Sequence, residues 1–238
     1  MSVVASDGRV LTLLARRDGI GPVQLAVIDG SGSVRSVAIP GVTAGVTAPS
    51  TPTGVVRFAS PGLAAHGSRA VVVGPENLVD VDLETLATRE QRLDTRTTAR
   101  PSKIIEGWGR SAVWLRGGTI AYTGWSIDDA HKRTTTGVRA AVVDTGATRV
   151  LDARAASVQR AGATVLVHGN GPLRGFDLDG TQRYETLGAQ DTGYVQVAGR
   201  YAYIGSRNST RFAVLDVASG RVVGLARTAK PTVVRAPY

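Results

Sequence analysis

The sequence predicts an all-β fold that repeats one unit of about four short strands. Short runs rich in Val, Ile, Leu, Thr and Tyr alternate with Gly, Asp and Ser, which is typical of strands joined by tight turns. No segment of helical length carries apolar residues at a helical period, and the best helical candidate, residues 60–65, is interrupted by Pro61 and Gly62. One two-part pattern recurs five times along the 238 residues. A repeated unit of this kind is typical of β-propeller blades.

The first part of the unit is a Gly-led turn followed by a β-branched or aromatic run. It occurs at residues 8–13, 67–73, 118–122, 162–167 and 199–204. The second part is an apolar run that ends in Asp and a turn, at residues 25–30, 78–82, 141–146, 175–180 and 213–220. A further run usually follows, as at 34–39, 148–151 or 221–225. Gly supplies positive φ and Asp hydrogen-bonds to the backbone two residues on, so both residue types favour hairpin turns.

The spacing of the units indicates the number of blades. The aspartates that end the second run are Asp29, Asp82, Asp144, Asp177 and Asp216, and they lie 53, 62, 33 and 39 residues apart. Units of this length predict one propeller domain over residues 1–238, with five blades of about four antiparallel strands. A ring of six or seven blades in a longer parent chain is the alternative. We expect the chain to start inside a blade and residues 232–234 to pair into the first blade and close the ring.

One copy of the repeat is similar to a known blade signature. Residues 215–223 (Leu-Asp-Val-Ala-Ser-Gly-Arg-Val-Val) resemble the blades of quinoprotein-like and YVTN-type β-propellers, and residues 143–146 are a shortened version. Gly224 stands where the quinoprotein pattern has tryptophan, so the resemblance does not extend to the quinone, and we expect no cofactor. The Trp-Asp pair of WD40 repeats is also missing. The sequence resembles propeller-like proteins of GC-rich, actinobacterial-like bacteria, many of which are exported.

The net charge of +9 raises the question of a polyanionic partner. The charge is diffuse, and only residues 181–238 are clearly basic, at +5. Because 25 of the 28 basic residues are Arg in a chain rich in Ala, Gly and Val, a GC-rich coding genome explains part of the charge. No run of five to eight Lys or Arg is present, so we do not expect nucleic acid. If the chain is a polyanion-binding envelope protein, the candidate residues are Arg200, Arg207 and Arg211.

The sequence contains no complete catalytic set. Gly-x-Ser-x-Gly and Walker motifs are missing, and the absence of cysteine removes thiolate nucleophiles and thiolate metal sites. His66, His131 and His168 lie far apart, so we interpret His168 as an ordinary strand-end histidine and expect no metal site. We therefore predict a non-enzymatic binding or scaffold protein. The alternative class is a propeller enzyme, a lyase or hydrolase with carboxylates in the central channel.

Two Asp-x-Asp pairs have a spacing that could offer oxygen ligands to calcium. They are Asp80 with Asp82 and Asp177 with Asp179. Neither continues as an EF-hand loop. We interpret these residues as hairpin-turn aspartates.

The most distinctive segment is a polar stretch in the third unit. Trp108, Trp114 and Trp125 fall within 18 residues, and Trp125 opens the stretch 126–137. A long loop on a rigid scaffold is where binding residues tend to lie. The candidate ligand-binding residues are Trp125, Asp128, Asp129, His131, Lys132 and Arg133, and the partner would be a protein, a peptide or a glycan. In the alternative interpretation, the tryptophans fill the core between blades and the loop is a tolerated insertion.

The sequence shows no targeting or membrane segment. The N-terminus lacks a basic region followed by an apolar region, and the uncharged stretch 36–56 contains three prolines, which predicts a loop. We expect a monomer that stays in the cytoplasm, or that derives from an exported, extracytoplasmic parent trimmed of its signal.

Overall fold

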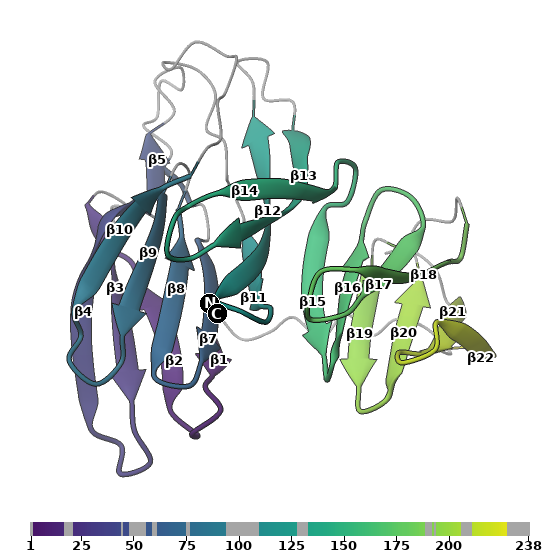
Figure 1. Cartoon of the computed structure of the whole chain (residues 1–238), viewed down its shortest axis with the longest axis horizontal. Coiled ribbons are helices and arrows are strands. Elements are labelled where there is room, and N and C mark those ends of the chain that lie inside the picture. Colours follow the sequence, from purple (N-terminus) through teal and green to yellow (C-terminus); the bar gives the residue numbers. More distant parts are fainter. Residues whose placement is uncertain are drawn as a thin grey trace.

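A computed structural model describes residues 2–16, 21–43, 45–47, 56–58, 61–74, 77–93, 110–127, 133–188, 192, 194–205 and 211–227. Within these residues every regular element is a β-strand (Figure 1), and there are 22 of them. The all-β prediction is therefore confirmed. In the same part of the chain, no helix is long and apolar enough to cross a membrane.

The strands form five four-stranded antiparallel sheets, each made of strands that follow one another along the chain. Blade 1 contains β1 (Ser2–Val4), β2 (Val10–Leu14), β3 (Pro22–Ile28) and β4 (Val34–Thr43). Blade 2 contains β7 (Gly62–His66), β8 (Arg69–Val73), β9 (Asn77–Asp82) and β10 (Thr88–Arg92). Blade 3 contains β11 (Ser111–Trp114), β12 (Thr119–Ile127), β13 (Arg133–Val142) and β14 (Thr148–Asp152). Blade 4 contains β15 (Ser157–Ala161), β16 (Thr164–His168), β17 (Leu173–Phe176) and β18 (Gln182–Thr186). Blade 5 contains β19 (Tyr194–Ala198), β20 (Tyr201–Gly205), β21 (Arg211–Asp216) and β22 (Arg221–Arg227), and a separate hairpin is formed by β5 (Gly45–Thr47) and β6 (Val56–Phe58).

The five repeats predicted from the sequence correspond to the five blades, with three corrections at their edges. The chain does not start inside a blade, because Ser2–Val4 pairs with β2 and supplies the first strand of blade 1. The predicted loop 36–56 is wrong over residues 36–43, where β4 continues through Pro40, and over residues 45–47, which form β5. An outermost strand tolerates proline, since one of its edges has no partner. Residues 133–137 belong to β13 rather than to a loop.

The aspartates that end the third strands stabilise the hairpins that follow. The Asp82 carboxylate accepts hydrogen bonds from the backbone N–H groups of Glu84 and Thr85. Asp177 does the same for Asp179 and Thr181. These amides favour the ionised carboxylate, chiefly through Thr85 and Thr181, and they lower the pKa of both aspartates. The interpretation as turn aspartates is confirmed for Asp82 and Asp177, but it is wrong for Asp80, which lies within β9 and pairs with Arg69.

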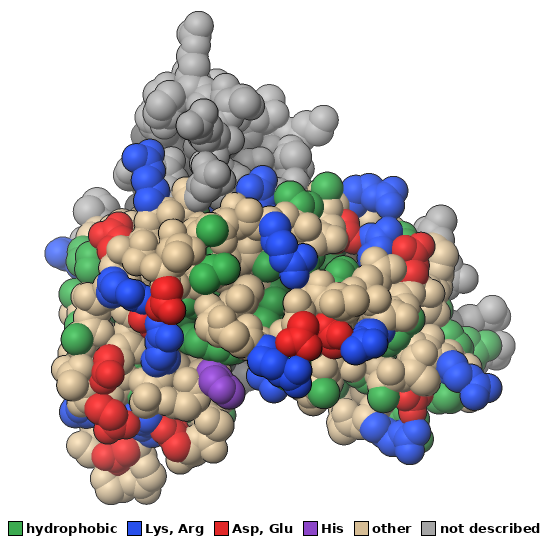
Figure 2. Space-filling view, in the orientation of Figure 1, with side chains coloured by type: hydrophobic (Ala, Val, Ile, Leu, Met, Phe, Trp, Pro, Cys, Tyr) green, Lys and Arg blue, Asp and Glu red, His purple; other side chains and the backbone are tan. Residues whose placement is uncertain are grey.

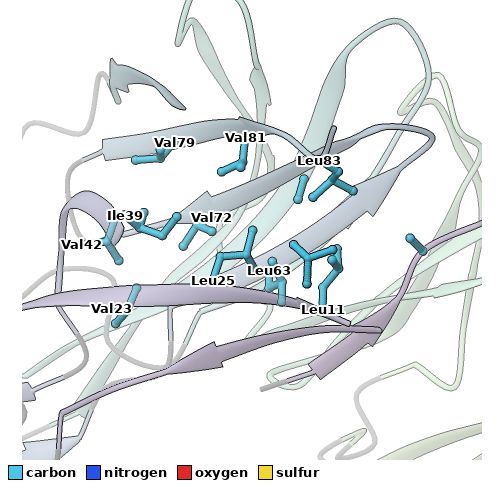
Figure 3. Close-up of a cluster of buried hydrophobic side chains, with 13 residues drawn as sticks. Leu11, Val23, Leu25, Ile39, Val42, Leu63, Val72, Val79, Val81 and Leu83 are labelled. Carbon is cyan, nitrogen blue, oxygen red and sulfur yellow. The ribbon is translucent and has the colours of Figure 1, made fainter. Parts of the chain in front are cut away.

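Apolar side chains pack each blade against the next one along the chain. Between blades 1 and 2, Leu11 and Leu25 face Val72, Val79 and Val81 (Figure 3). Three similar clusters join blades 2 and 3, blades 3 and 4, and blades 4 and 5. Because successive side chains of a strand point to opposite faces of the sheet, a central blade contributes alternate residues to two clusters. In β8, for example, Val72 packs towards blade 1, whereas Val71 and Val73 pack towards blade 3.

Figure 1 shows the arrangement of the described blades. Blade 1 lies at the left end of Figure 1 and blade 5 at the right end. In the described part of the chain, no apolar cluster joins blade 5 to blade 1. The closing strand predicted at residues 232–234 lies outside the described residues, so ring closure through it stays a prediction.

Candidate functional site

Arginines in the first hairpin of three blades form ion pairs with the next blade. Their acceptors lie in the turn after the third strand of that blade. The pairs are Arg9 with Glu84 (2.8 Å), Arg69 with Asp144 (3.2 Å) and Arg116 with Asp179 (3.0 Å). These three ion pairs therefore connect one blade to the next.

The pair between blades 2 and 3 belongs to a network of four charged groups. Arg69 also binds Asp80 at 2.6 Å, and Arg89 reaches both Asp80 and Asp144. The hydrogen bond from Arg89, and then that from Arg69, lowers the pKa of Asp144. Asp80, a member of one Asp-x-Asp pair, is thus held by arginines.

A groove of about 360 Å³ opens at the corresponding place between blades 3 and 4. Its apolar lining includes Leu115, Val142 and Leu178, and its polar lining includes Arg116, Arg149 and the acidic Asp179. The backbone N–H of Arg116 donates to the carbonyl oxygen of Leu178 at 2.7 Å and ties the two blades together beside the groove. The volume falls in the range of about 300–1,000 Å³ that is common for ligand sites.

The two arginines at this groove are held in place but not enclosed. The side chain of Arg116 is 70% exposed although its Nη1 contacts Asp179. Arg149 donates from Nη2 to the carbonyl oxygens of Asp179 and Gly180, both at 3.4 Å. Each guanidinium has five N–H donors in a planar fork that matches a carboxylate. The arrangement can therefore accept an anionic group beside an apolar one.

The ligand-binding residues predicted from the sequence fall largely outside the described part. Asp128, Asp129, His131 and Lys132 lie outside the described residues. Trp125 and Arg133 belong to β12 and β13, where their backbones pair with Thr135 and Ile127, but their side chains are not described. Trp108 also lies outside the described residues. Trp114 is buried against blade 2, as expected if it fills the core between blades.

The basic residues predicted for a polyanion site have different surroundings. Arg200 donates from Nε to Asp216 at 3.1 Å and lies over the ring of Tyr201. Arg207 is outside the described residues, as is the side chain of Arg211. Basic and acidic side chains are interspersed on the face shown in Figure 2 rather than gathered into one basic field.

The two described histidines lie at different blade interfaces. His66, at the end of β7, stacks on Trp114 with 5.8 Å between ring centroids. His168 is only 5% exposed at the end of β16, and its Nδ1 lies 2.9 Å from the carbonyl oxygen of Thr192. The interpretation of His168 as a strand-end histidine is confirmed. Among the described residues, no group of three or more His, Asp or Glu is placed to hold a metal ion.

Sequence reasoning did not single out Arg116 or Arg149, and it considered Asp179 only as a member of an Asp-x-Asp pair. Arg116 and Asp179 are 63 positions apart in the chain, and only the packing of blade 3 on blade 4 brings them together. One feature of the sequence could have indicated the role of Arg116. Arg9, Arg69, Arg116 and Arg200 all occur at the first hairpin of their blades, so aligning the repeats would have exposed the recurrence.

Comparisons with known proteins support the β-propeller fold of this chain. No protein-family model matches the sequence, and no curated protein matches it. The similar solved structures are β-propellers. AztD from Citrobacter koseri is 13% identical, with a TM-score of 0.50 over 92% of this chain and 59% of that one. A chain of the mitotic checkpoint complex is 14% identical, with a TM-score of 0.53 over 96% and 63%. BamB from Moraxella catarrhalis is 17% identical, with a TM-score of 0.49 over 95% and 66%, so this chain spans less than two thirds of all three.

Proposed function

We propose that this protein is a non-enzymatic binding propeller whose groove between blades 3 and 4 binds an acidic segment of a partner protein. The observation that supports the proposal is that Arg116 and Arg149 both line a partly apolar groove. The guanidinium of Arg149 is already held by two backbone carbonyl oxygens. It therefore loses little conformational entropy when it binds a carboxylate. The adjacent Leu115 and Leu178 would accept an apolar side chain of the same segment.

A second candidate site is the tip of the β12–β13 hairpin, with Trp125, Asp128, Asp129, His131, Lys132 and Arg133. The observation that favours it is the pairing pattern. Beyond a register shift after Thr123, the two strands continue to pair with each other, while β11 reaches only as far as Thr123. The hairpin therefore extends past its sheet. Because Thr119 lines the groove and Trp125 is six residues further along β12, the two sites lie about 20 Å apart along the strand.

Fluorescence anisotropy with a labelled oligoglutamate peptide tests the proposal, with oligolysine of the same length as the charge control. We expect oligoglutamate to bind, with an affinity that falls as salt rises, and oligolysine not to bind. Replacing both groove arginines (Arg116→Ala with Arg149→Ala) should weaken binding by about tenfold or more. Arg183→Ala is the matched control, because Arg183 is a similarly exposed, ion-paired arginine on the outer strand of blade 4.

Two results separate the alternatives. Loss of binding in Trp125→Ala with full binding in the groove variant would move the site to the hairpin tip. Equal weakening by the groove variant and by Arg183→Ala would show attraction to general positive charge, and the groove would then not be the site.

A further inference from the structure

The outer strand of blade 3, β14, borders the groove between blades 3 and 4. It is the last strand of its sheet, so in the described part of the chain only β13 pairs with it. Thr148 and Arg149 line the groove. Arg149 is exposed, and the next residue, Val150, is 55% exposed. Because successive side chains of a strand point to opposite faces, β14 is accessible on both faces at its middle.

The register of β13 and β14 assigns the two exposed side chains to different faces. Arg149 is opposite Ala140, which packs towards blade 4. Directly opposed residues point to the same face of a sheet, so Arg149 lies on the groove face of blade 3. Val150 is opposite Arg139 and lies on the other face.

The backbone of β14 directs hydrogen-bonding groups outward at Thr148 and Val150. At the hairpin, the N–H of Val142 donates to the carbonyl oxygen of Ala147 at 3.0 Å, so these two residues form a hydrogen-bonded pair. Such pairs alternate with pairs that are not hydrogen-bonded along an antiparallel ladder. The next pair, Ala141 with Thr148, is therefore of the second kind. Thr148 and Val150 thus point their N–H and C=O groups away from β13.

The residues of β14 differ from those of the other outer strands. Proline and charged side chains on an edge strand discourage pairing with a further strand. β4 contains Pro40, and β10 (Thr-Arg-Glu-Gln-Arg) and β18 (Gln-Arg-Tyr-Glu-Thr) are largely charged or polar. In β14 the two charged residues are otherwise engaged, because Arg149 faces the groove and the buried Asp152 forms an ion pair with Arg174. β22 is also apolar, but of these two strands only β14 borders the groove.

We propose that the acidic segment that binds the groove is extended and pairs antiparallel with β14 as a fifth strand of blade 3. This inference rests on the proposed function of the groove and specifies the conformation of the partner segment. Main-chain bonds to Thr148 and Val150 would supply affinity, and alternating side chains would supply specificity. The antiparallel direction is the more stable one per residue.

The pairing also specifies a sequence pattern in the partner. The residue opposite Arg149 would face the groove and would be acidic, since opposite charges attract across a strand pair. Its neighbour opposite Val150 would be apolar and would cover the exposed valine. A residue two positions from the acidic one shares its face, so an apolar residue there would meet Leu115 and Leu178 in the groove.

Fluorescence anisotropy with a labelled peptide of Glu-Val repeats tests the strand pairing. When the glutamates face the groove, the N–H groups of the valines point to β14 and those of the glutamates point to solvent. N-methylation of the valines should therefore weaken binding by about tenfold or more, because several hydrogen bonds are lost. N-methylation of the glutamates in a peptide of identical composition and charge should have little effect. Equal weakening by the two modifications, or greater weakening by the methylated glutamates, would overturn the proposal.

Proline substitution tests the same contact from the side of the protein. Val150→Pro removes an outward N–H and leaves the bonds to β13 in place, so the variant should fold, which circular dichroism verifies. It should weaken binding of the Glu-Val peptide by about fivefold or more. Thr88→Pro is the matched control. The N–H of Asp82 donates to the carbonyl oxygen of Ala87, so Thr88 likewise points its N–H outward, on β10 of blade 2 and away from the groove.

The groove variant (Arg116→Ala with Arg149→Ala) separates this inference from the proposed function. Binding that is lost in the groove variant, but is unchanged in Val150→Pro and with methylated valines, would leave the groove as the site and overturn the pairing with β14. If neither the Glu-Val peptide nor oligoglutamate binds the wild-type chain, the proposed function fails and the strand pairing fails with it.

Discussion

His168 joins blade 4 to blade 5 in its neutral form. Its Nδ1 faces the carbonyl oxygen of Thr192 at 2.9 Å, so this nitrogen carries the hydrogen. Its Nε2 lies 3.1 Å from the amide nitrogen of Gln159, which donates to it. The same amide nitrogen donates to the carbonyl oxygen of Val195 in β19 at 3.3 Å. Protonation of Nε2 would place two donors against each other, and turning the Gln159 amide would break the bond to blade 5.

The sign of the resulting pH dependence follows from burial. Burial lowers the pKa of His168 below its ordinary value of 6.5, and the bond to Thr192 opposes this only in part. The unfolded chain therefore takes up the proton first as pH falls, so the free energy of unfolding decreases below about pH 6.5. The greatest loss that one such histidine can cause between about pH 7.5 and about pH 5.5 is about 1.4 kcal/mol.

Urea unfolding, followed by circular dichroism at several pH values in this range, measures the effect. The free energy of unfolding of the wild-type chain should fall as the pH is lowered. The variant His168→Gln should be less stable at neutral pH, but its free energy of unfolding should depend less on pH. His66→Gln is the control, since His66 is an exposed histidine at the end of β7. If the wild-type chain and His168→Gln lose equal stability between these pH values, the assignment of the pH dependence to His168 is wrong.

Two further predictions concern the junction between blades 4 and 5. The hydroxyl of Tyr184 donates to the carbonyl oxygen of Val217 at 2.6 Å, so Tyr184→Phe should cost about 1 kcal/mol and lower the melting temperature by roughly 2–4 °C; an unchanged temperature would contradict a role for this bond. Gly220 has φ +71, and an added Cβ would lie 2.4 Å from the Tyr184 ring. Gly220→Ala should therefore cost roughly 2–5 kcal/mol, whereas Gly8→Ala, with φ +86 and open space, should cost only about 1–2 kcal/mol. Equal losses in calorimetry would refute the steric argument.

The sequence by itself determined the repeat and the class of fold, because both depend on local chemistry. Turn residues such as Gly8 and Asp177 act within a few positions of themselves. The alternation of Tyr201, Ala202 and Tyr203 specifies two faces of one strand whatever lies on either side. Five blades could therefore be counted from one sequence, and His168 could be placed at the end of its strand.

Strands whose residues have low β-propensity could be assigned only from the tertiary structure. The segment Gly62–His66 contains Gly and two Ala, residues with low strand propensity, and it overlaps the best helical candidate of the sequence. It becomes β7 because β8 supplies its hydrogen-bond partners and because its side chains fill clusters on both faces of blade 2. Pairing and burial outweigh a propensity difference of at most about 1 kcal/mol.

Only the tertiary structure brought together the residues proposed to bind partners. Arg116 and Asp179 meet because blade 4 packs on blade 3, and the position of one blade on another depends on how many side chains fit together rather than on any single motif.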